Sequence, residues 1–149
     1  MLFRSLNRLG AAQCTEARDG DVMEPGRAYL APGDKHLLVE GNPGALRARL
    51  SDGPAENFCR PSVDPMLRSA THACGGRVLV VMLTGMGHDG LAGSRQVVAA
   101  GGGVIAQDEA TSVVWGMPGA VAQAGLCSQV LPLPAIASRV LDSFRTARP

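Results

Sequence analysis

The sequence predicts an α/β fold: a mostly parallel sheet flanked by helices in three layers (α/β/α), with a small antiparallel β excursion near residues 19–53. Two observations carry this prediction. From residue 77 onward, apolar runs of strand length alternate with helical patterns, and right-handed crossovers make such strands parallel. Between residues 19 and 53, turn signals such as Asp-Gly and Pro-Gly recur every few residues, which is typical of short antiparallel strands.

The first half of the chain is expected to hold two helices and several short strands. Apolar residues at positions 2, 3, 6 and 9 have helical spacing, so residues 2–9 should form an amphipathic helix. The alternating stretch "ALRARL" predicts a half-exposed strand. Asp64 followed by Pro65 has the signature of a helix N-cap and first helical position. The expected strands are 14–17, 28–31, 36–40 and 45–50, and the second helix ends at about residue 73.

The second half of the chain alternates strand and helix. Residues 78–83 form a continuous apolar run, as expected of a strand that is buried on both faces. Further strands are expected at 104–107 and 127–131, and helices at about 90–100, 117–124 and 134–145. Because no linker divides the chain, residues 1–149 are predicted to form a single domain.

Composition excludes several classes of protein. The 14 basic and 13 acidic side chains leave no charge excess for binding nucleic acid, and no apolar run approaches the roughly 20 residues needed for membrane insertion. The four cysteines are scattered, with no Cys-x-x-Cys pair, so we expect reduced thiols, no metal site and a cytoplasmic location. The cysteines are Cys14, Cys59, Cys74 and Cys127.

The loop "GMGHDG", residues 85–90, has three interpretations. As a G-x-G-x-x-G turn between a strand and a helix, Gly85, Gly87 and Gly90 would let a backbone approach a nucleotide's phosphates. Against this, Asp89 would place a carboxylate where those phosphates lie. Alternatively, Asp89 stands at the end of a parallel strand, where a buried carboxylate can orient an imidazole for acyl transfer. The third interpretation is that Asp89 only caps the helix that follows it.

Several longer segments favour the second interpretation. "LTGMGHDGLAG", "AGGGVIAQDEATSVVWGMPGAV" and "QVLPL" resemble the C-terminal catalytic domain of the chemotaxis protein-glutamate methylesterases (CheB-type). Upstream, "PGRAYLAPGDKHLLVE" and "CRPSVDPML" resemble the same family in the same order, so the resemblance covers nearly all of residues 2–145. It implies a cytoplasmic Ser-His-Asp hydrolase without a cofactor. Its expected partners are chemoreceptors, whose methylated glutamates it demethylates and whose glutamines it often deamidates.

The resemblance also assigns roles to residues of this chain. Asp89 matches the carboxylate of the triad, and Met86 and Gly87 lie beside the oxyanion region. His88 falls at a variable position and receives no role. A substrate-side loop is expected at Arg60, Ser62, Asp64 and Met117.

Some parts of the family pattern do not occur in this sequence. The family's serine lies in a Gly-Ala-Ser-Thr-Gly-Gly type turn and its histidine in a Gln-His-Met-Pro type run, and neither is present here. Cys59 stands where the family commonly has a histidine before Arg-Pro-Ser-Val-Asp. We therefore expect an N-terminally incomplete domain that lacks the first strands and the receiver domain through which a histidine kinase would act. The chain alone should have no meaningful methylesterase activity, and its uncovered sheet edge should invite self-association or a partner.

Three functions therefore stay open: a methylesterase by descent, a non-catalytic domain that binds the receptor, and a nucleotide-binding module. Two local interpretations accompany them. Asp34, Lys35 and His36 are read as a polar turn between two strands, and Arg60 is expected to pair with Asp64 and organise the "CRPSVD" loop.

Overall fold

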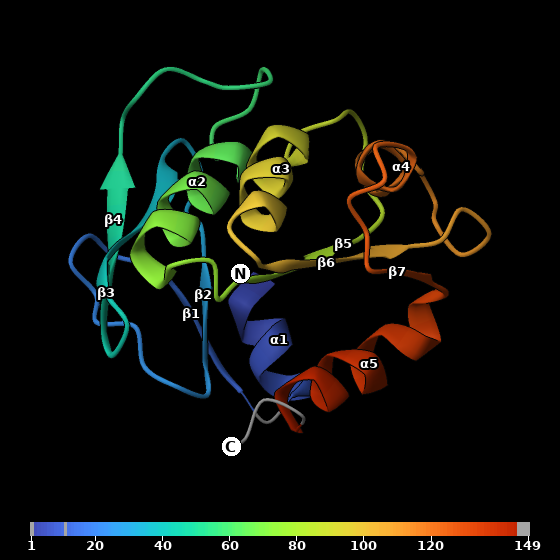
Figure 1. The fold of residues 1–149 in the computed structure, drawn as a ribbon. Coiled ribbons are helices and arrows are strands. Elements are labelled where there is room, and N and C mark those ends of the chain that lie inside the picture. Colours follow the sequence, from blue (N-terminus) through green and yellow to red (C-terminus); the bar gives the residue numbers. More distant parts are fainter. Residues whose placement is uncertain (1, 11, 146–149) are drawn as a thin grey trace.

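Helices cover both faces of a three-stranded parallel sheet in the computed structural model, which describes residues 2–10 and 12–145 (Figure 1). This arrangement confirms the predicted three-layer α/β/α fold class. The elements in chain order are α1 (Leu2–Leu9), β1 (Gln13–Glu16), β2 (Arg27–Leu30), β3 (His36–Asn42), β4 (Ala45–Ser51), α2 (Val63–Cys74), β5 (Leu79–Met82), α3 (Leu91–Ala99), β6 (Gly103–Gln107), α4 (Met117–Gln123), β7 (Gln129–Leu131) and α5 (Leu133–Arg145).

The central sheet has the strand order β5-β6-β7, with both pairs parallel. Helices α2, α3 and α4 lie on one face of it, and α1 and α5 lie on the other (Figure 1). The carboxyl ends of the three strands meet at one edge, because all three run in the same direction. The loop that carries Asp89 follows β5 at this edge, where parallel sheets place their functional groups.

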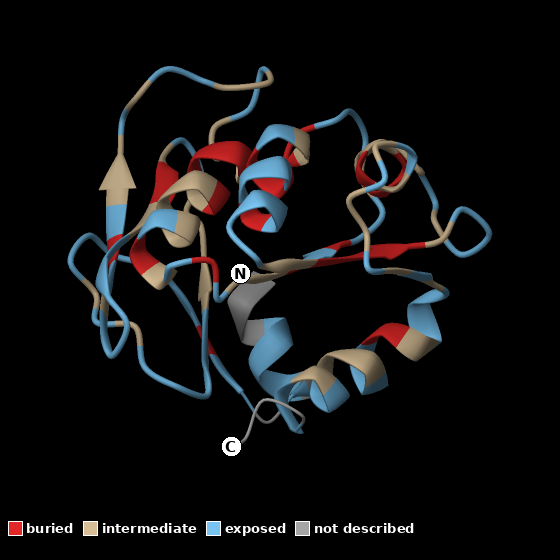
Figure 2. Ribbon diagram, in the orientation of Figure 1, coloured by how far each residue is buried: buried red, intermediate tan, exposed pale blue. Residues whose placement is uncertain are grey.

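The main core lies between this sheet and the upper helices. Met82 on β5, Ala106 on β6 and Val97 on α3 are at most 4% exposed and belong to one apolar cluster. Figure 2 shows the same pattern, with buried residues on the inner sides of α2 and α3 and exposed residues on their outer sides. Gly93 has no side chain, which lets α3 approach α2 closely at Leu67.

The antiparallel excursion is confirmed for β3 and β4, which pair from His36↔Ser51 to Asn42↔Ala45. Within the same region β2 behaves differently, because it pairs in parallel with β1, from Gln13↔Arg27 to Glu16↔Leu30. The turn signals before β2 were therefore correct, but they do not identify the neighbouring strand. In "ALRARL" Ala48 is only 1% exposed and Leu46 and Leu50 are half-buried, whereas the two arginines are exposed.

The expectation that residues 78–83 are buried on both faces was wrong. Val80 and Met82 are buried under the helices, but Val81 is 36% exposed and Leu83 is 44% exposed. The reason is that β5 is an edge strand in the described sheet and pairs only with β6. Helix α5 packs instead over β6, where Ile105 is 1% exposed.

Candidate active site

Asp89 lies in the loop that joins β5 to α3, at the carboxyl edge of the sheet. Gly87 and Gly90 on either side of it have positive φ angles of 85° and 88°, which turn the chain sharply. The turn directs the Asp89 side chain inward, so that this residue is only 7% exposed. A carboxylate buried to this extent requires hydrogen-bond donors.

Four donors surround the Asp89 carboxylate, and three of them come from the start of α2. The backbone N–H of Val63 donates to Oδ2 at 2.7 Å. The Ser62 hydroxyl donates to Oδ1 at 2.8 Å, and the Asp64 backbone N–H donates to the same oxygen at 3.2 Å. The fourth donor is the side-chain amide of Asn57, 2.9 Å from Oδ1. Asp89 therefore caps α2 and not the helix that follows it, which corrects the third interpretation of this loop.

Asp64 provides the matching cap for α3. Its Oδ1 accepts a hydrogen bond from the Gly93 backbone N–H at 2.6 Å, in the first turn of α3. The sequence predicted Asp64 as the N-cap of its own helix, but that helix begins at Val63 with Ser62 at the cap position. The two helices thus exchange caps. Asp89, just before α3, caps α2, and Asp64, at the start of α2, caps α3.

Asn57 joins the two carboxylates. Its Nδ2 donates to Asp64 Oδ2 at 2.8 Å and to Asp89 Oδ1 at 2.9 Å, so both amide hydrogens are used. No feature of the sequence singled out this residue. It lies in a turn between Glu56 and Cys59, where Asn57 and Phe58 both have positive φ angles. Such turns are usually signalled by Asn-Gly, and the Asn-Phe pair here gives no comparable signal.

The hydrogen bonds keep Asp89 ionised. Burial raises the pKa of the Asp89 carboxyl, but the hydrogen bonds from Val63, Ser62 and their neighbours outweigh it, so the pKa lies below its ordinary value. Oδ1 already accepts three hydrogen bonds, whereas Oδ2 accepts one. A further donor, such as an imidazole N–H, would therefore find free acceptor capacity at Oδ2.

His36 is part of the support behind this site. It was read as part of a polar turn, but it is 3% exposed on β3 and accepts a hydrogen bond at Nδ1 from the Ser62 backbone N–H at 3.2 Å. Its Nε2 lies 2.9 Å from the carbonyl oxygen of Pro54. Because Nδ1 accepts, the hydrogen is on Nε2 and the ring is neutral. His36 thus fixes Ser62 and does not reach Asp89.

Arg60 does not pair with Asp64, which corrects the interpretation of the "CRPSVD" loop. Its guanidinium instead binds Asp34, with nitrogen-oxygen distances of 2.6 Å and 3.1 Å to Oδ1. It also donates to the carbonyl oxygens of Asp52 and Gly53. Arg60 therefore ties this loop to the β2–β3 and β4 connections and leaves Asp64 to α3.

The remaining predicted residues lie on the other side of Asp89. Met86 is 85% exposed at the sheet edge. Gly87 packs tightly against Gly116, since a Cβ on Gly116 would lie 2.8 Å from the Gly87 nitrogen. Met117 is half-buried at the start of α4 and packs against the main core. A Cβ on Gly85 would come within 2.7 Å of its Sδ. Met117 thus contributes to packing beneath the loop.

These contacts also explain the glycine pattern without a nucleotide. Gly90, like Gly85, has no room for a side chain, since a Cβ there would lie 2.7 Å from Met82 Cε and 3.0 Å from Val63 Cγ1. In addition, the Asp64 carboxylate already accepts from one amide in the first turn of α3, that of Gly93. Close packing and an internal carboxylate thus take the place that a phosphate would need.

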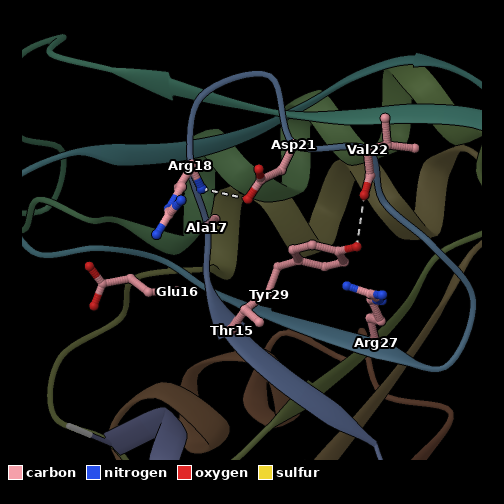
Figure 3. Close-up of a pocket in the computed structure, with 8 residues that line it drawn as sticks. All are labelled: Thr15, Glu16, Ala17, Arg18, Asp21, Val22, Arg27 and Tyr29. Atoms are coloured by element: carbon pink, nitrogen blue, oxygen red, sulfur yellow. Dashed lines mark hydrogen bonds between the residues drawn. The ribbon is translucent and has the colours of Figure 1, made fainter.

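One cavity lies near Asp64, at the carboxyl edge of the central sheet, and another lies beside the β1–β2 sheet. The first, of about 190 Å³, opens beside the carboxylate pair and is lined by Asn57, Asp64, His88, Leu91, Ala92 and Arg95. The second, of about 480 Å³, is lined by residues of β1, β2 and the segment between them (Figure 3). In it, the Tyr29 hydroxyl donates to the Val22 carbonyl oxygen at 2.8 Å. None of the residues that hold Asp89 lines this second cavity.

Comparison with known proteins identifies the family of the chain. Residues 1–140 match the family model described as CheB methylesterase. The chain belongs to the CheB methylesterase family. A crystal structure of the CheB methylesterase catalytic domain from Thermotoga maritima superposes with a TM-score of 0.91 at 37% sequence identity, over 95% of this chain and 75% of that one. The family resemblance predicted from the sequence motifs is thereby confirmed.

Two CheB relatives are more similar in sequence. The protein-glutamate methylesterase/protein-glutamine glutaminase 1 of Paramagnetospirillum magneticum is 55% identical over 141 residues, which are 95% of this chain and 37% of the relative. A second such protein, of the group 2 operon of Rhodospirillum centenum, is 60% identical over 136 residues, or 91% of this chain and 34% of the relative. The chain thus spans only about a third of the length of these relatives.

Two further findings concern the described residues of this CheB-family chain. No helix among them is both long enough and apolar enough to cross a membrane. Within the same residues, no group of three or more His, Cys, Asp and Glu side chains is placed to hold a metal ion.

Proposed function

We propose that this chain is the acid-bearing part of a protein-glutamate methylesterase that acts on methylated glutamates of chemoreceptors in the cytoplasm. Asp89 is its orienting carboxylate. The observation that carries the proposal is the Asp89 side chain itself, which is 7% exposed, ionised, and held at the carboxyl end of β5 by four donors. Family membership and the names of the relatives support the same reaction.

The chemistry requires a serine and a histidine from outside the described residues. The serine attacks the ester carbonyl while the imidazole takes its proton, and the imidazolium then returns this proton to the departing methoxide, which leaves as methanol. Water hydrolyses the acyl-enzyme by the same exchange. Asp89 would accept the second imidazole N–H at Oδ2, fixing the tautomer and stabilising the imidazolium. Glutamine deamidation would follow the same steps, with ammonia as the leaving group.

Other predicted residues have proposed roles around Asp89. The backbone N–H groups of Met86 and Gly87 are the proposed oxyanion donors, since this exposed loop precedes Asp89 at the same sheet edge. Arg60 is the proposed substrate-side cation of the "CRPSVD" loop. A histidine kinase acting through a receiver domain is a proposed partner of the longer protein.

The test joins this chain to a segment that carries the Gly-Ala-Ser-Thr-Gly-Gly turn and the Gln-His-Met-Pro run of a relative. The joined protein should release methanol from methylated chemoreceptor, and Asp89→Ala should lower kcat on the order of 10⁴-fold. Asp52→Asn is the matched control, because it changes an exposed carboxylate that pairs with Lys35 and should leave kcat unchanged.

Two outcomes would contradict the proposal. One is full kcat in the Asp89→Ala variant, which would remove Asp89 from the reaction. The other is methanol release by the 149-residue chain alone at the rate of the joined protein, since no imidazole contacts Asp89 within the described residues.

A further inference from the structure

Two buried carboxylates, those of Asp64 and Asp89, lie side by side at the carboxyl edge of the sheet. Asp64 and Asp89 are 4% and 7% exposed, and one nitrogen atom, Asn57 Nδ2, lies within 2.9 Å of an oxygen of each. Their facing oxygens are therefore separated by no more than the length of two hydrogen bonds. Two buried carboxylates this close repel each other, and without a donor between them the pair would tend to bind a proton.

The position of Asn57 is maintained by a strained turn. Asn57 and Phe58 have φ angles of 52° and 62°, and the turn is closed by hydrogen bonds between Glu56 and Cys59. Asparagine tolerates this conformation, but a left-handed phenylalanine is uncommon. The Phe58 side chain is fully exposed, so burial of its ring does not compensate for the strain. This turn directs the Asn57 amide toward the carboxylates of Asp64 and Asp89.

The turn is also anchored to α2. Arg68 binds Glu56 through two hydrogen bonds, of 2.6 Å and 2.8 Å, which tie the turn to the helix. Asn57 is thereby fixed relative to Ser62 and the first residues of α2, which provide the other donors to Asp89.

We propose that Asn57 is a positioning residue for Asp89: its amide bridges the two carboxylates and, by donating to Oδ1, leaves Oδ2 as the acceptor for the imidazole. This inference rests on the proposed function of Asp89. Asn57 itself touches no reacting atom. The amide nitrogen must face the carboxylates, because the amide oxygen in its place would meet two further acceptors.

Other titratable groups surround the pair, and the test must separate their effects from that of Asn57. They are Arg68 on α2, Glu56 in the turn, His36 on β3, His88 beside Asp89 and Arg95 on α3. None of them changes in the variants described next.

The experiment measures the side-chain carboxyl ¹³C shifts of Asp64 and Asp89 against pH in the 149-residue chain. Asn57→Gly removes the amide while glycine accepts the left-handed backbone, and Asn57→Asp keeps the size but replaces a donor by a third carboxylate. The matched control is Phe58→Gly, which makes the same change one position along the same turn. We expect the Asp89 titration to move to higher pH in Asn57→Gly, to move further in Asn57→Asp, and to stay unchanged in Phe58→Gly.

An Asp89 titration that is the same in Asn57→Gly as in the unchanged chain would overturn the proposal. If Asn57→Gly does not fold, Asn57→Asp provides the measurement. If both Asn57 variants unfold while Phe58→Gly remains folded, the amide serves folding and the positioning role is refuted.

A kinetic measurement separates this inference from the proposed function. In the joined protein with the serine and histidine, Asn57→Gly should lower kcat on the order of 10- to 100-fold and leave KM nearly unchanged, because substrate does not contact Asn57. A rise in KM at constant kcat would contradict positioning. If the joined protein with Asn57 intact releases no methanol, the proposed function fails, whereas the titration still decides whether Asn57 sets the state of Asp89.

Discussion

At the scale of single residues, Asp89 combines an observed structural role with the chemical role that we propose for it. Oδ1 is filled by donors that hold the molecule together, and Oδ2 retains acceptor capacity at the sheet edge. Replacing Asp89 therefore affects stability as well as activity. A loss of activity alone would not identify its chemical role unless the folded fraction is measured in parallel.

Asp89→Asn should lower the free energy of unfolding by about 2–4 kcal/mol, because an amide N–H₂ group would face buried donors that lose their acceptor. Urea unfolding at neutral pH measures this change. Asp52→Asn is the control, since this exposed carboxylate pairs with Lys35 at the surface, where solvent screens the interaction, and its loss should change stability little. Equal losses in both variants would show that the Asp89 hydrogen bonds contribute no more than a surface pair.

The residues of this site were only partly predictable from sequence. Asp89 was found through its motif, and the "CRPSVD" segment led to Ser62 and Asp64, but the contacts among them were not predicted. Asp64 was expected to cap its own helix and Arg60 to pair with Asp64. Caps exchanged between helices depend on how α2 and α3 pack, which spacing along one helix does not encode.

At the scale of elements, the most constrained contact is the close approach of α2 and α3. A Cβ on Gly93 would lie 2.6 Å from Leu67 Cβ and 3.2 Å from Asp64 Oδ1. The same residue donates its backbone N–H to Asp64. Gly93 thus sets both the separation of the helices and one of their exchanged caps.

Gly93→Ala should therefore destabilise the protein by about 1–3 kcal/mol, although alanine is the better helix former. Thermal and urea unfolding measure the loss. Gln96→Ala, on the exposed side of α3, is the control and should change stability by less than about 0.5 kcal/mol. A stabilised Gly93→Ala variant would mean that helix propensity outweighs packing at this contact.

Element types were well predicted, because the apolar periods of strands and helices are local features of the sequence. The predicted second helix and the observed α2, Val63–Cys74, differ by only a residue or two at each end. Strand partners were harder to predict. β2 lies among turn-rich, antiparallel-looking sequence, and its parallel pairing with β1 depends on a long-range contact that no local pattern contains.

At the scale of the whole molecule, the carboxylate network makes stability depend on pH. Burial raises the pKa of Asp89, but the hydrogen bonds to its carboxylate lower the pKa by more than burial raises it. The folded state therefore binds the proton less readily than the unfolded state. The corresponding stability is complete above the ordinary aspartate pKa of about 3.9, and is lost as pH falls through the lower pKa of the folded state. The Glu56 carboxyl, whose pKa is lowered by its hydrogen bond from Arg68, acts in the same direction.

Unfolding midpoints in urea should therefore stay level above about pH 5 and fall as the pH drops below about 4, and Asp89→Asn should flatten this dependence. Lys35→Met provides a comparison, since it removes the partner of Asp52, whose lowered pKa comes from the Lys35 hydrogen bond in a solvent-exposed pair. It should alter the pH profile less than Asp89→Asn does. An Asp89→Asn variant with the original pH dependence would show that other groups control acid unfolding.

The exposed face of β5 leads to a prediction about association. Val81 on β5 and Leu83, just past the end of this strand, are 36% and 44% exposed, and β5 forms an edge of the described sheet. An edge with unpaired backbone groups and apolar side chains can pair with another strand, and a second copy of the chain offers the same edge. We therefore expect sedimentation velocity to show self-association that increases with protein concentration.

Leu83→Lys should reduce this self-association, whereas Val113→Lys, which changes an exposed valine in the loop after β6, should not. A monomer at every concentration, with normal unfolding, would contradict the prediction and leave these side chains as ordinary exposed apolar surface.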